Sequence, residues 1–328
     1  MKLVKLSINS SKESVYRQSP NNDGIWGQYK FIVNEEIEEC DFWVVYSKGE
    51  RKSDASKVAP ENIIFISGEP EPIYHYANKF VKQFSTVVTT RQDIDHSNII
   101  NLHPAQPWWV GRRTIKDGSI VFDLLYEDLF ISPEKTKLIS VITSNKSFTK
   151  GHNDRIHFVQ KLKSHFGSYL DVYGKGINDF DDKWSVLKDY KYHIVIENSS
   201  YRDYWTEKLA DCFLADSFPF YHGCTNLNKY FQPNSYKYID IYDLKKSIKV
   251  IEESIENNLW EKNYVYLKEA KKLIMHEHNI LPYISKICDN MDASLNKKQV
   301  IIKNEMFYID VYKIPMLLRR IFFKYFYR

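Results

Sequence analysis

The side chains between Asn198 and Lys208 form the group in this chain best suited to bind a phosphate. An apolar run, 193–196, ends just before them, and apolar residues after them recur with the i, i+3, i+4 spacing of a core-facing helix. We expect Asp203 to cap that helix, whose free N–H groups and the Lys208 ammonium would favour a pyrophosphate. Glu207 can accept hydrogen bonds from ribose hydroxyls. An ordinary capped helix with solvated side chains is the alternative.

Arg155 is a second candidate for phosphate binding. It lies in the first turn of a helix expected over 153–165, directly after an apolar run at 138–143. A guanidinium at this place can bind a phosphate through two parallel hydrogen bonds. A surface arginine with no ligand is the alternative interpretation.

Both groups follow apolar runs that alternate with helical periodicity, which predicts α/β structure with parallel sheets and a ligand site at the carboxyl ends of the strands. Proline and polar residues at 131–137 interrupt the pattern. We therefore predict a first domain at 1–135, a second at 138–290 and a C-terminal tail at 291–328. The expected strands are 1–8, 41–46, 63–67, 86–89, 138–143, 170–173, 193–196 and 218–221, and the expected helices are 122–130, 153–165, 181–189 and 203–216.

Composition narrows the class of protein. A net charge of +4 over 328 residues is too small to indicate nucleic-acid binding. The four cysteines are far apart and form no CxxC pair, so neither a zinc site nor a disulfide framework is indicated, and a reducing cytoplasm fits best. The first residues, MKLVKLSINSS, lack the apolar region of a signal peptide, and no run approaches the length of a membrane span.

The run I-E-N-S-S-Y-R-D-Y-W-T-E-K at 196–208 resembles the motif F-E-N-S-x-x-x-D-Y-x-T-E-K of glycosyltransferase family 10, the inverting fucosyltransferases. Only the opening aromatic residue is replaced. The similarity continues at 171–176 (D-V-Y-G-K-G), 219–223 and 231–236, in family order. It covers residues 138 to 245 without a break.

This resemblance implies a GT-B fold, in which two Rossmann-like domains face each other across a cleft. It implies transfer of L-fucose from GDP-fucose to a glycan hydroxyl by single displacement with inversion, with no required cofactor and a divalent metal at most stimulatory. GlcNAc or Glc of a surface polysaccharide or lipopolysaccharide, with an α1,3 linkage, is the expected acceptor. The donor-binding residues that it assigns are Arg155, Asn198, Tyr204, Glu207 and Lys208.

The first half resembles the family more weakly, at F-I-S-G-E-P-E-P, 65–72. Glu69 matches the catalytic carboxylate there and would take the proton from the acceptor hydroxyl. Glu71 is the rival candidate, and two exposed loop carboxylates are the alternative interpretation. Farther on, Trp108 and Trp109 match a proline-aromatic stretch of the family. Their rings could stack on an acceptor sugar or pack between the domains.

Two departures from the family pattern, His222 and Trp205, leave the donor sugar less certain than the fold. A transferase of the same type that uses another nucleotide sugar is one alternative, and a non-catalytic carbohydrate-binding or scaffold protein is another. Asp179 and Asp181 form a D-x-D, which is the metal motif of a different transferase architecture. We interpret it here as a solvated loop and expect no metal site.

The last residues, 313–328, combine basic side chains at i, i+4 spacing with an apolar face and contain no acid. Such a helix is typical of proteins that bind the surface of an anionic membrane. We therefore expect a cytoplasmic protein held peripherally at the inner face of the membrane. Docking of this helix on the protein body is the alternative.

Overall fold

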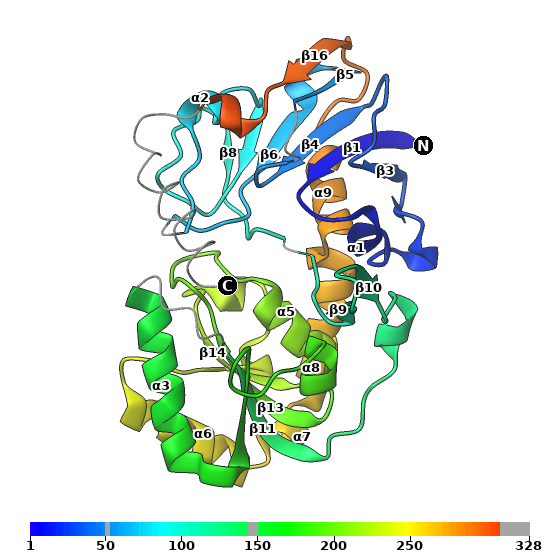
Figure 1. Cartoon of the computed structure of the whole chain (residues 1–328). Helices are drawn as coiled ribbons and strands as arrows, with labels where there is room; N and C mark the ends of the chain where they lie inside the picture. Colours follow the sequence, from blue (N-terminus) through cyan, green and yellow to red (C-terminus); the bar gives the residue numbers. More distant parts are fainter. Residues whose placement is uncertain (50–52, 72, 106, 144–149, 309–328) are drawn as a thin grey trace.

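The structure is a computed structural model that describes residues 1–49, 53–71, 73–105, 107–143 and 150–308. Figure 1 shows two α/β units, one above the other, each built around a parallel sheet. This arrangement confirms the predicted α/β class with two parallel sheets. The helix predicted at 313–328 lies outside the described residues, so membrane association stays a prediction. Within the described ranges, no helix has the length and apolar character that crossing a bilayer requires.

The first sheet has the strand order β2-β3-β1-β4-β6-β7-β8, and all its neighbours are parallel except β2 and β3. Side chains along β4 and β6 alternate between two apolar cores, and both faces are buried. The strands are β1 (Lys2–Ile8), β2 (Ile25–Trp26), β3 (Tyr29–Val33), β4 (Phe42–Tyr46), β6 (Ile63–Ile66), β7 (Thr86–Val88) and β8 (Ile99–Ile100).

The second sheet is fully parallel, with the order β12-β11-β13-β14-β15. The strand order reverses at β11, and α/β sheets usually bind ligands at such a reversal. Its strands are β11 (Lys137–Ile142), β12 (Leu170–Tyr173), β13 (Tyr190–Ile196), β14 (Phe218–His222) and β15 (Lys237–Tyr238). Two antiparallel pairs complete the strands: β9 (Arg112–Thr114) with β10 (Ile120–Phe122), and β5 (Asp54–Val58) with β16 (Lys298–Ile302).

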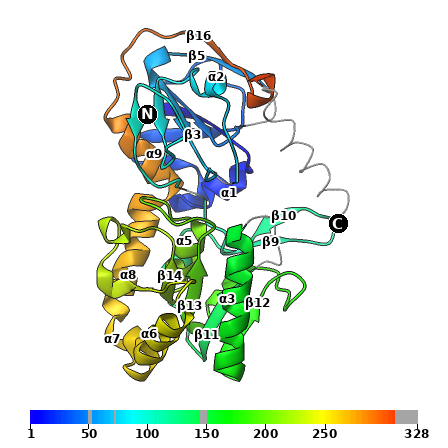
Figure 2. The same cartoon turned by 90° about the vertical axis from the view of Figure 1, so that its left-hand side faces the viewer.

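Most of the helices pack around the second sheet (Figure 2). The α-helices are α1 (Lys12–Tyr16), α2 (Asn78–Val81), α3 (Lys150–Phe166), α4 (Lys183–Leu187), α5 (Glu207–Leu214), α6 (Leu244–Glu256), α7 (Leu259–Lys262), α8 (Tyr264–Leu273) and α9 (Ile280–Asp289), and a π-helical turn, η7 (Ile274–His278), joins the last two. Short 3₁₀ turns are η1 (Pro20–Asn22), η2 (Pro60–Asn62), η3 (Glu127–Phe130), η4 (Gly167–Tyr169), η5 (Leu227–Lys229), η6 (Pro233–Ser235) and η8 (Glu305–Tyr308).

The end of the described chain returns to the first unit. Ile280, Leu281 and Ile284 of α9 belong to one core of the first sheet, together with alternate residues of β1 and β4. β16 pairs with β5, and the Glu305 carboxylate accepts a hydrogen bond from the backbone N–H of Ala77 at 3.0 Å. The predicted division at 135/138 and 290/291 stays a prediction, but residues 280–308 lie against the first sheet.

Two predicted helices differ from the structure. The stretch 122–130 contains the end of β10 and the 3₁₀ turn η3 instead of an α-helix. The helix predicted to begin at Asp203 begins at Glu207, because Asp203 has a left-handed backbone with φ of 61° and cannot continue a helix. The other predicted strands and helices agree with the structure to within a few residues.

Candidate functional site

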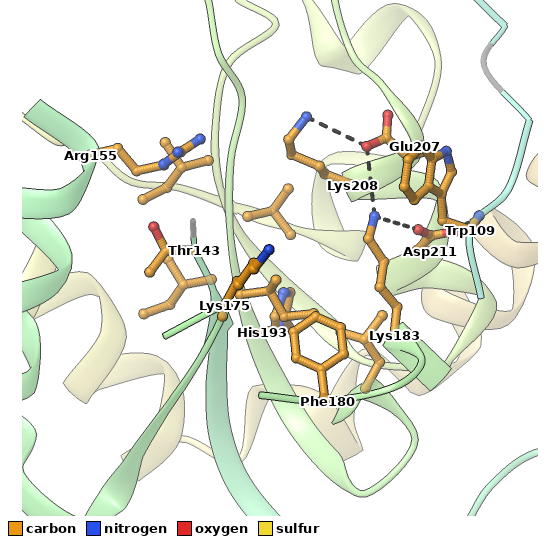
Figure 3. A pocket seen from close by; sticks show the side chains of 16 residues that line it. Trp109, Thr143, Arg155, Lys175, Phe180, Lys183, His193, Glu207, Lys208 and Asp211 are labelled. Atoms are coloured by element: carbon orange, nitrogen blue, oxygen red, sulfur yellow. Dashed lines mark hydrogen bonds and ion pairs between the residues drawn. The ribbon is translucent and has the colours of Figure 1, made fainter. Parts of the chain in front are cut away.

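A cavity of about 230 Å³ lies at the carboxyl ends of β11, β12 and β13, beside the first turn of α5 (Figure 3). We call it the donor cavity. Among the residues that the structure describes, four cationic side chains line it from four different elements or loops, whereas the two carboxylates both come from α5. The charged lining residues are Arg155, Lys175, Lys183, Lys208, Glu207 and Asp211.

The first turn of α5 is fixed by a buried carboxylate, that of Glu197. It accepts hydrogen bonds from the backbone N–H of Thr206 at 2.9 Å, from the Thr206 hydroxyl at 2.7 Å and from the Lys208 ammonium at 3.3 Å. Thr206 is the residue that caps the helix, so the expectation that Asp203 does so is wrong. The glutamate of the E-N-S-S run therefore holds the helix start, and Gly223 leaves room for it, because a Cβ there would lie 2.5 Å from the Glu197 Cγ.

Asp203 instead organises the loop before α5. Its carboxylate accepts hydrogen bonds from Asn226 at 3.0 Å, Lys229 at 2.8 Å and the Tyr230 hydroxyl at 2.5 Å. Burial would raise the pKa of Asp203, but these donors lower it below its ordinary value. The aspartate is therefore a charged anchor that connects this loop to residues 226–230.

Lys208 and Glu207 belong to one network of ion pairs in the donor cavity (Figure 3). The Glu207 carboxylate lies 3.7 Å from the Lys208 ammonium and 3.6 Å from that of Lys183, which is 2.8 Å from Asp211. Burial would lower the pKa of Lys208, but Glu207 and Glu197 outweigh it and raise the pKa. Burial likewise opposes ionisation of Glu207, yet Lys208 and Lys183 lower its pKa. Both side chains are ionised at neutral pH.

Arg155 lines the opposite side of this cavity, as its position in α3 predicted. Its Nη1 donates to the Oδ1 of Asn198 at 3.1 Å, which links α3 to the turn after β13. Burial lowers the pKa of Arg155, with Glu197 opposing it, although a guanidinium stays charged at any ordinary pH. The structure thus brings together Arg155, Asn198, Glu207 and Lys208, four of the five predicted donor residues.

Tyr204 is the fifth, and its side chain is buried, with 2% exposed. The ring stacks on Tyr201 with 4.8 Å between centroids and is not part of the donor cavity lining. A direct contact between this side chain and a ligand stays a prediction.

A second cavity of about 340 Å³ lies at the carboxyl ends of β1, β4 and β6 and contains Glu69, the predicted base. We call it the acceptor cavity. Hydrogen bonds hold the loop of Glu69: Arg91 donates to the Glu69 carbonyl at 2.9 Å, and the backbone N–H groups of Gly68 and Glu69 donate to the Tyr76 hydroxyl at 3.2 and 3.4 Å. Glu71, the rival candidate, is exposed and does not line this cavity.

Trp109 lines both cavities and therefore lies between them. Its side chain is 44% exposed, whereas Trp108 is 1% exposed in the core of the second unit. A ring as deeply buried as that of Trp108 cannot stack on a sugar, and it packs in the core of the second unit instead of between the domains. The Trp109 ring has the Arg112 guanidinium carbon at 4.8 Å and the Lys183 ammonium at 5.5 Å from its centroid, so stacking of this ring on a sugar stays a prediction.

Sequence reasoning missed the residues that hold Trp109 in place. The Asp211 carboxylate accepts hydrogen bonds from the backbone N–H groups of Trp109 at 2.9 Å and Val110 at 3.3 Å. Burial raises the pKa of Asp211, with Lys183 opposing it. The i, i+4 spacing of Glu207 and Asp211 was the available signal, since it puts both carboxylates on one side of α5. Nothing in the local sequence indicated that Lys183 would bridge them.

Asp179 and Asp181 lie in an exposed loop, where the Asp179 carboxylate accepts a hydrogen bond from the Gly176 N–H at 2.8 Å. Among the residues that the structure describes, no group of three or more His, Cys, Asp or Glu is placed to hold a metal ion.

Comparison with known proteins places this arrangement in a family. The human 4-galactosyl-N-acetylglucosaminide 3-alpha-L-fucosyltransferase 9 is 27% identical over 153 residues, which are 45% of this chain and 39% of that protein. The chain thus spans about two fifths of the length of this relative. Crystal structures of an alpha1,3-fucosyltransferase with GDP and with GDP-fucose show 16% and 15% identity and TM-scores of 0.49 and 0.46, each covering 85% of this chain and 92% of the other.

The model of a family described as glycosyltransferase family 10 (fucosyltransferase) C-term matches residues 132–305. This match contains every residue of the donor cavity except Trp109. Because it covers more than half of the chain, the protein belongs to glycosyltransferase family 10, the fucosyltransferase family.

Proposed function

We propose that this protein transfers L-fucose from GDP-fucose to a hydroxyl of a glycan, with inversion at the anomeric carbon. The observation that carries the proposal is the pair of cavities on either side of Trp109, one cationic and one containing Glu69. The cationic cavity suits the negative charge of a nucleoside diphosphate, and the Glu69 carboxylate can take the proton of an acceptor hydroxyl. Family membership supports fucose as the transferred sugar.

In the proposed reaction, the acceptor hydroxyl oxygen forms a bond to C1 of fucose while the bond from C1 to the phosphate oxygen breaks. The hydroxyl proton passes to the Glu69 carboxylate, and GDP leaves with the bonding electron pair. Arg155 and Lys208 bind the diphosphate and stabilise the negative charge that develops on it. Glu207, held ionised between two lysines, accepts hydrogen bonds from hydroxyls of the ribose or the donor sugar.

GlcNAc or Glc, in a surface polysaccharide or lipopolysaccharide, is the proposed acceptor unit, and α1,3 is the proposed linkage. The name of the human relative, which describes 3-alpha-L-fucosyl transfer to a 4-galactosyl-N-acetylglucosaminide, supports GlcNAc and the α1,3 linkage. A transferase with another nucleotide sugar is the second candidate, because the cationic side chains bind the diphosphate and not the hexose.

A donor screen tests the proposal. GDP at 100 times its dissociation constant is expected to stabilise the protein by about 2.7 kcal/mol, seen as a higher melting temperature, whereas UDP and dTDP are not. GDP-fucose is expected to be the donor that supports transfer to N-acetyllactosamine. Stabilisation by UDP or dTDP favours the second candidate, and no turnover with any sugar nucleotide favours a non-catalytic carbohydrate-binding protein.

Replacement of the base separates binding from chemistry. Glu69→Gln is expected to lower kcat by about 10²- to 10⁴-fold and to leave the GDP-induced melting shift unchanged, because the carboxylate acts only on the acceptor proton. Glu71→Gln, an exposed acid two residues away, is the matched control and should keep full activity. Full activity in Glu69→Gln would remove this residue as the base.

A further inference from the structure

The acceptor cavity contains one cationic side chain, that of Arg112. Of the described residues that line this cavity, Arg112 and Glu69 are the two with a formal charge. Most of the others are hydroxyl-bearing or aromatic, which suits sugar hydroxyls and sugar faces. They include Ser10, Ser11, Ser14, Ser47, Tyr46 and Phe122. The guanidinium adds to these side chains a group that binds anions.

Arg112 differs from its neighbour Arg113 in its position relative to the cavity and in its charged partners. Successive residues of β9 point to opposite faces, so only one of the two arginines can face the cavity. Arg113 forms an ion pair with Asp123 and does not line the cavity. Arg112 has no carboxylate of the described residues within 4.0 Å, Glu69 included.

The ring of Trp109 supports the Arg112 side chain. The guanidinium carbon lies 4.8 Å from the ring centroid, a cation–π arrangement that orders the guanidinium without using its N–H donors. The backbone on either side of Trp109 is itself fixed, because Arg17 donates to the Val110 carbonyl at 2.7 Å and the Trp108 carbonyl at 2.5 Å. Arg112 is therefore held at the cavity with its donors available.

We propose that Arg112 selects acceptors that carry an acidic group, a carboxylate, sulfate or phosphate, and binds that group directly. The inference rests on the proposed function, since it concerns the acceptor of that reaction. A guanidinium binds such groups through two parallel hydrogen bonds. Glu69 repels an anion in its immediate surroundings, so the acidic group belongs to a sugar or substituent beside the reacting hydroxyl.

The test compares neutral and acidic forms of one acceptor with the full-length protein and GDP-fucose. The acceptors are N-acetyllactosamine and its 3′-sialyl and 6-sulfo derivatives, and the variants are Arg112→Gln, Arg112→Lys and the matched control Arg113→Gln. The wild type is expected to show at least tenfold higher kcat/KM for one acidic acceptor than for the neutral one. Arg112→Gln should abolish this ratio through KM of the acceptor, Arg112→Lys should restore part of it, and Arg113→Gln should keep it.

Two outcomes would overturn the inference. One is a wild type with no preference for either acidic acceptor, and the other is an Arg112→Gln variant that loses the same factor with neutral and acidic acceptors. A raised KM for GDP-fucose in that variant would also overturn it, because it would mean that Arg112 binds the diphosphate of the donor. Arg112 packs on Trp109, which borders both cavities.

A binding measurement separates this inference from the proposed function. The same three glycans are titrated calorimetrically into the GDP-saturated protein, where no turnover is needed. Binding that favours an acidic glycan tenfold and disappears in Arg112→Gln supports the acidic subsite even if fucose transfer fails. Equal binding of the three glycans, or binding of none, overturns it. The GDP-induced melting shift reports on the donor cavity independently.

Discussion

His193 shows what burial does to a single titratable residue in this site. It lies in the lining of the donor cavity, among cations, and its Nδ1 is 2.8 Å from the Ser140 hydroxyl. Burial, followed by the charges of Lys183 and Lys135, lowers the pKa of His193 to about 3. The ring is therefore neutral at physiological pH, and the positive charge of the cavity comes from arginine and lysine.

This lowered pKa predicts a loss of stability in acid. Between pH 6.5 and 3 the unfolded chain binds a proton at His193 that the folded chain does not, so the free energy of unfolding falls as the pH falls. The expected contribution of His193 is about 1.4 kcal/mol per pH unit below about pH 6 and none above pH 7, and it adds to those of His103 and His278, whose pKa values burial also lowers. Urea unfolding at pH 7, 6, 5 and 4 measures the slope. His193→Gln should reduce the slope by about this amount, whereas the exposed His165→Gln should not, and equal slopes in all three proteins would contradict the assignment.

At the scale of elements, the connection between α5 and the segment 108–111 decides how the two cavities meet. The Asp211 carboxylate accepts hydrogen bonds from the backbone N–H groups of that segment and forms an ion pair with Lys183 of α4. The Asp211 side chain is 1% exposed. The position of the Trp109 ring, which borders both cavities, thus depends on the buried Asp211 carboxylate of α5. Movement of α5 would move Trp109 with it.

Asp211→Asn is expected to lower the free energy of unfolding by about 1–3 kcal/mol, because the buried amide cannot form an ion pair with the Lys183 ammonium. KM for both the donor and the acceptor should rise, since Trp109 borders both cavities. Asp181→Asn, an exposed acid near α4, is the control. A double-mutant cycle with Lys183→Met should give a coupling energy of at least 0.5 kcal/mol, and strictly additive changes would show that the pair is not coupled.

At the scale of the whole molecule, the chain crosses between the two units more than once. After the second sheet and its helices, α9 returns to cover one face of the first sheet, and β16 adds a strand pair to β5 (Figure 1). Among the described residues of its own half of the sequence, the first sheet has only the short α-helices α1 and α2. The apolar face formed by β1 and β4 is therefore covered by α9, which comes from the C-terminal part of the described chain.

Ile284→Ala is expected to destabilise the first sheet by about 2–5 kcal/mol, because it leaves a cavity in that core, although β4 and β1 are about 240 and about 280 residues away in the sequence. Native-state hydrogen exchange would measure it as faster exchange of amides in β1 and β4. Lys286→Ala, at an exposed position of the same helix, should leave these rates unchanged. Slowly exchanging β1 and β4 amides in Ile284→Ala would mean that the sheet does not depend on α9.

The sequence by itself determined the buried strands and which candidate donor residues would lie near one another, while their role in binding a donor stays a prediction. Runs such as 63–66 and 194–196 are apolar over their whole length, and a parallel strand buried on both faces has this pattern. Arg155, Asn198, Glu207 and Lys208 come together because they follow neighbouring strands or begin the next helix, and the carboxyl ends of parallel strands share one edge. Local order along the chain was sufficient to predict the strands, and the resemblance to the family assigned the donor residues.

Only the tertiary structure decided the rest, because each remaining feature joins residues far apart in the sequence. Trp108 and Trp109 are identical in type and adjacent, and one is buried while the other borders both cavities, since Asp211 and Arg17 fix the backbone between them. Thr206 caps the helix instead of the predicted Asp203, whose carboxylate accepts hydrogen bonds from Asn226, Lys229 and Tyr230. Periodicity describes neighbours in the chain, whereas these contacts depend on how two sheets and a returning helix pack.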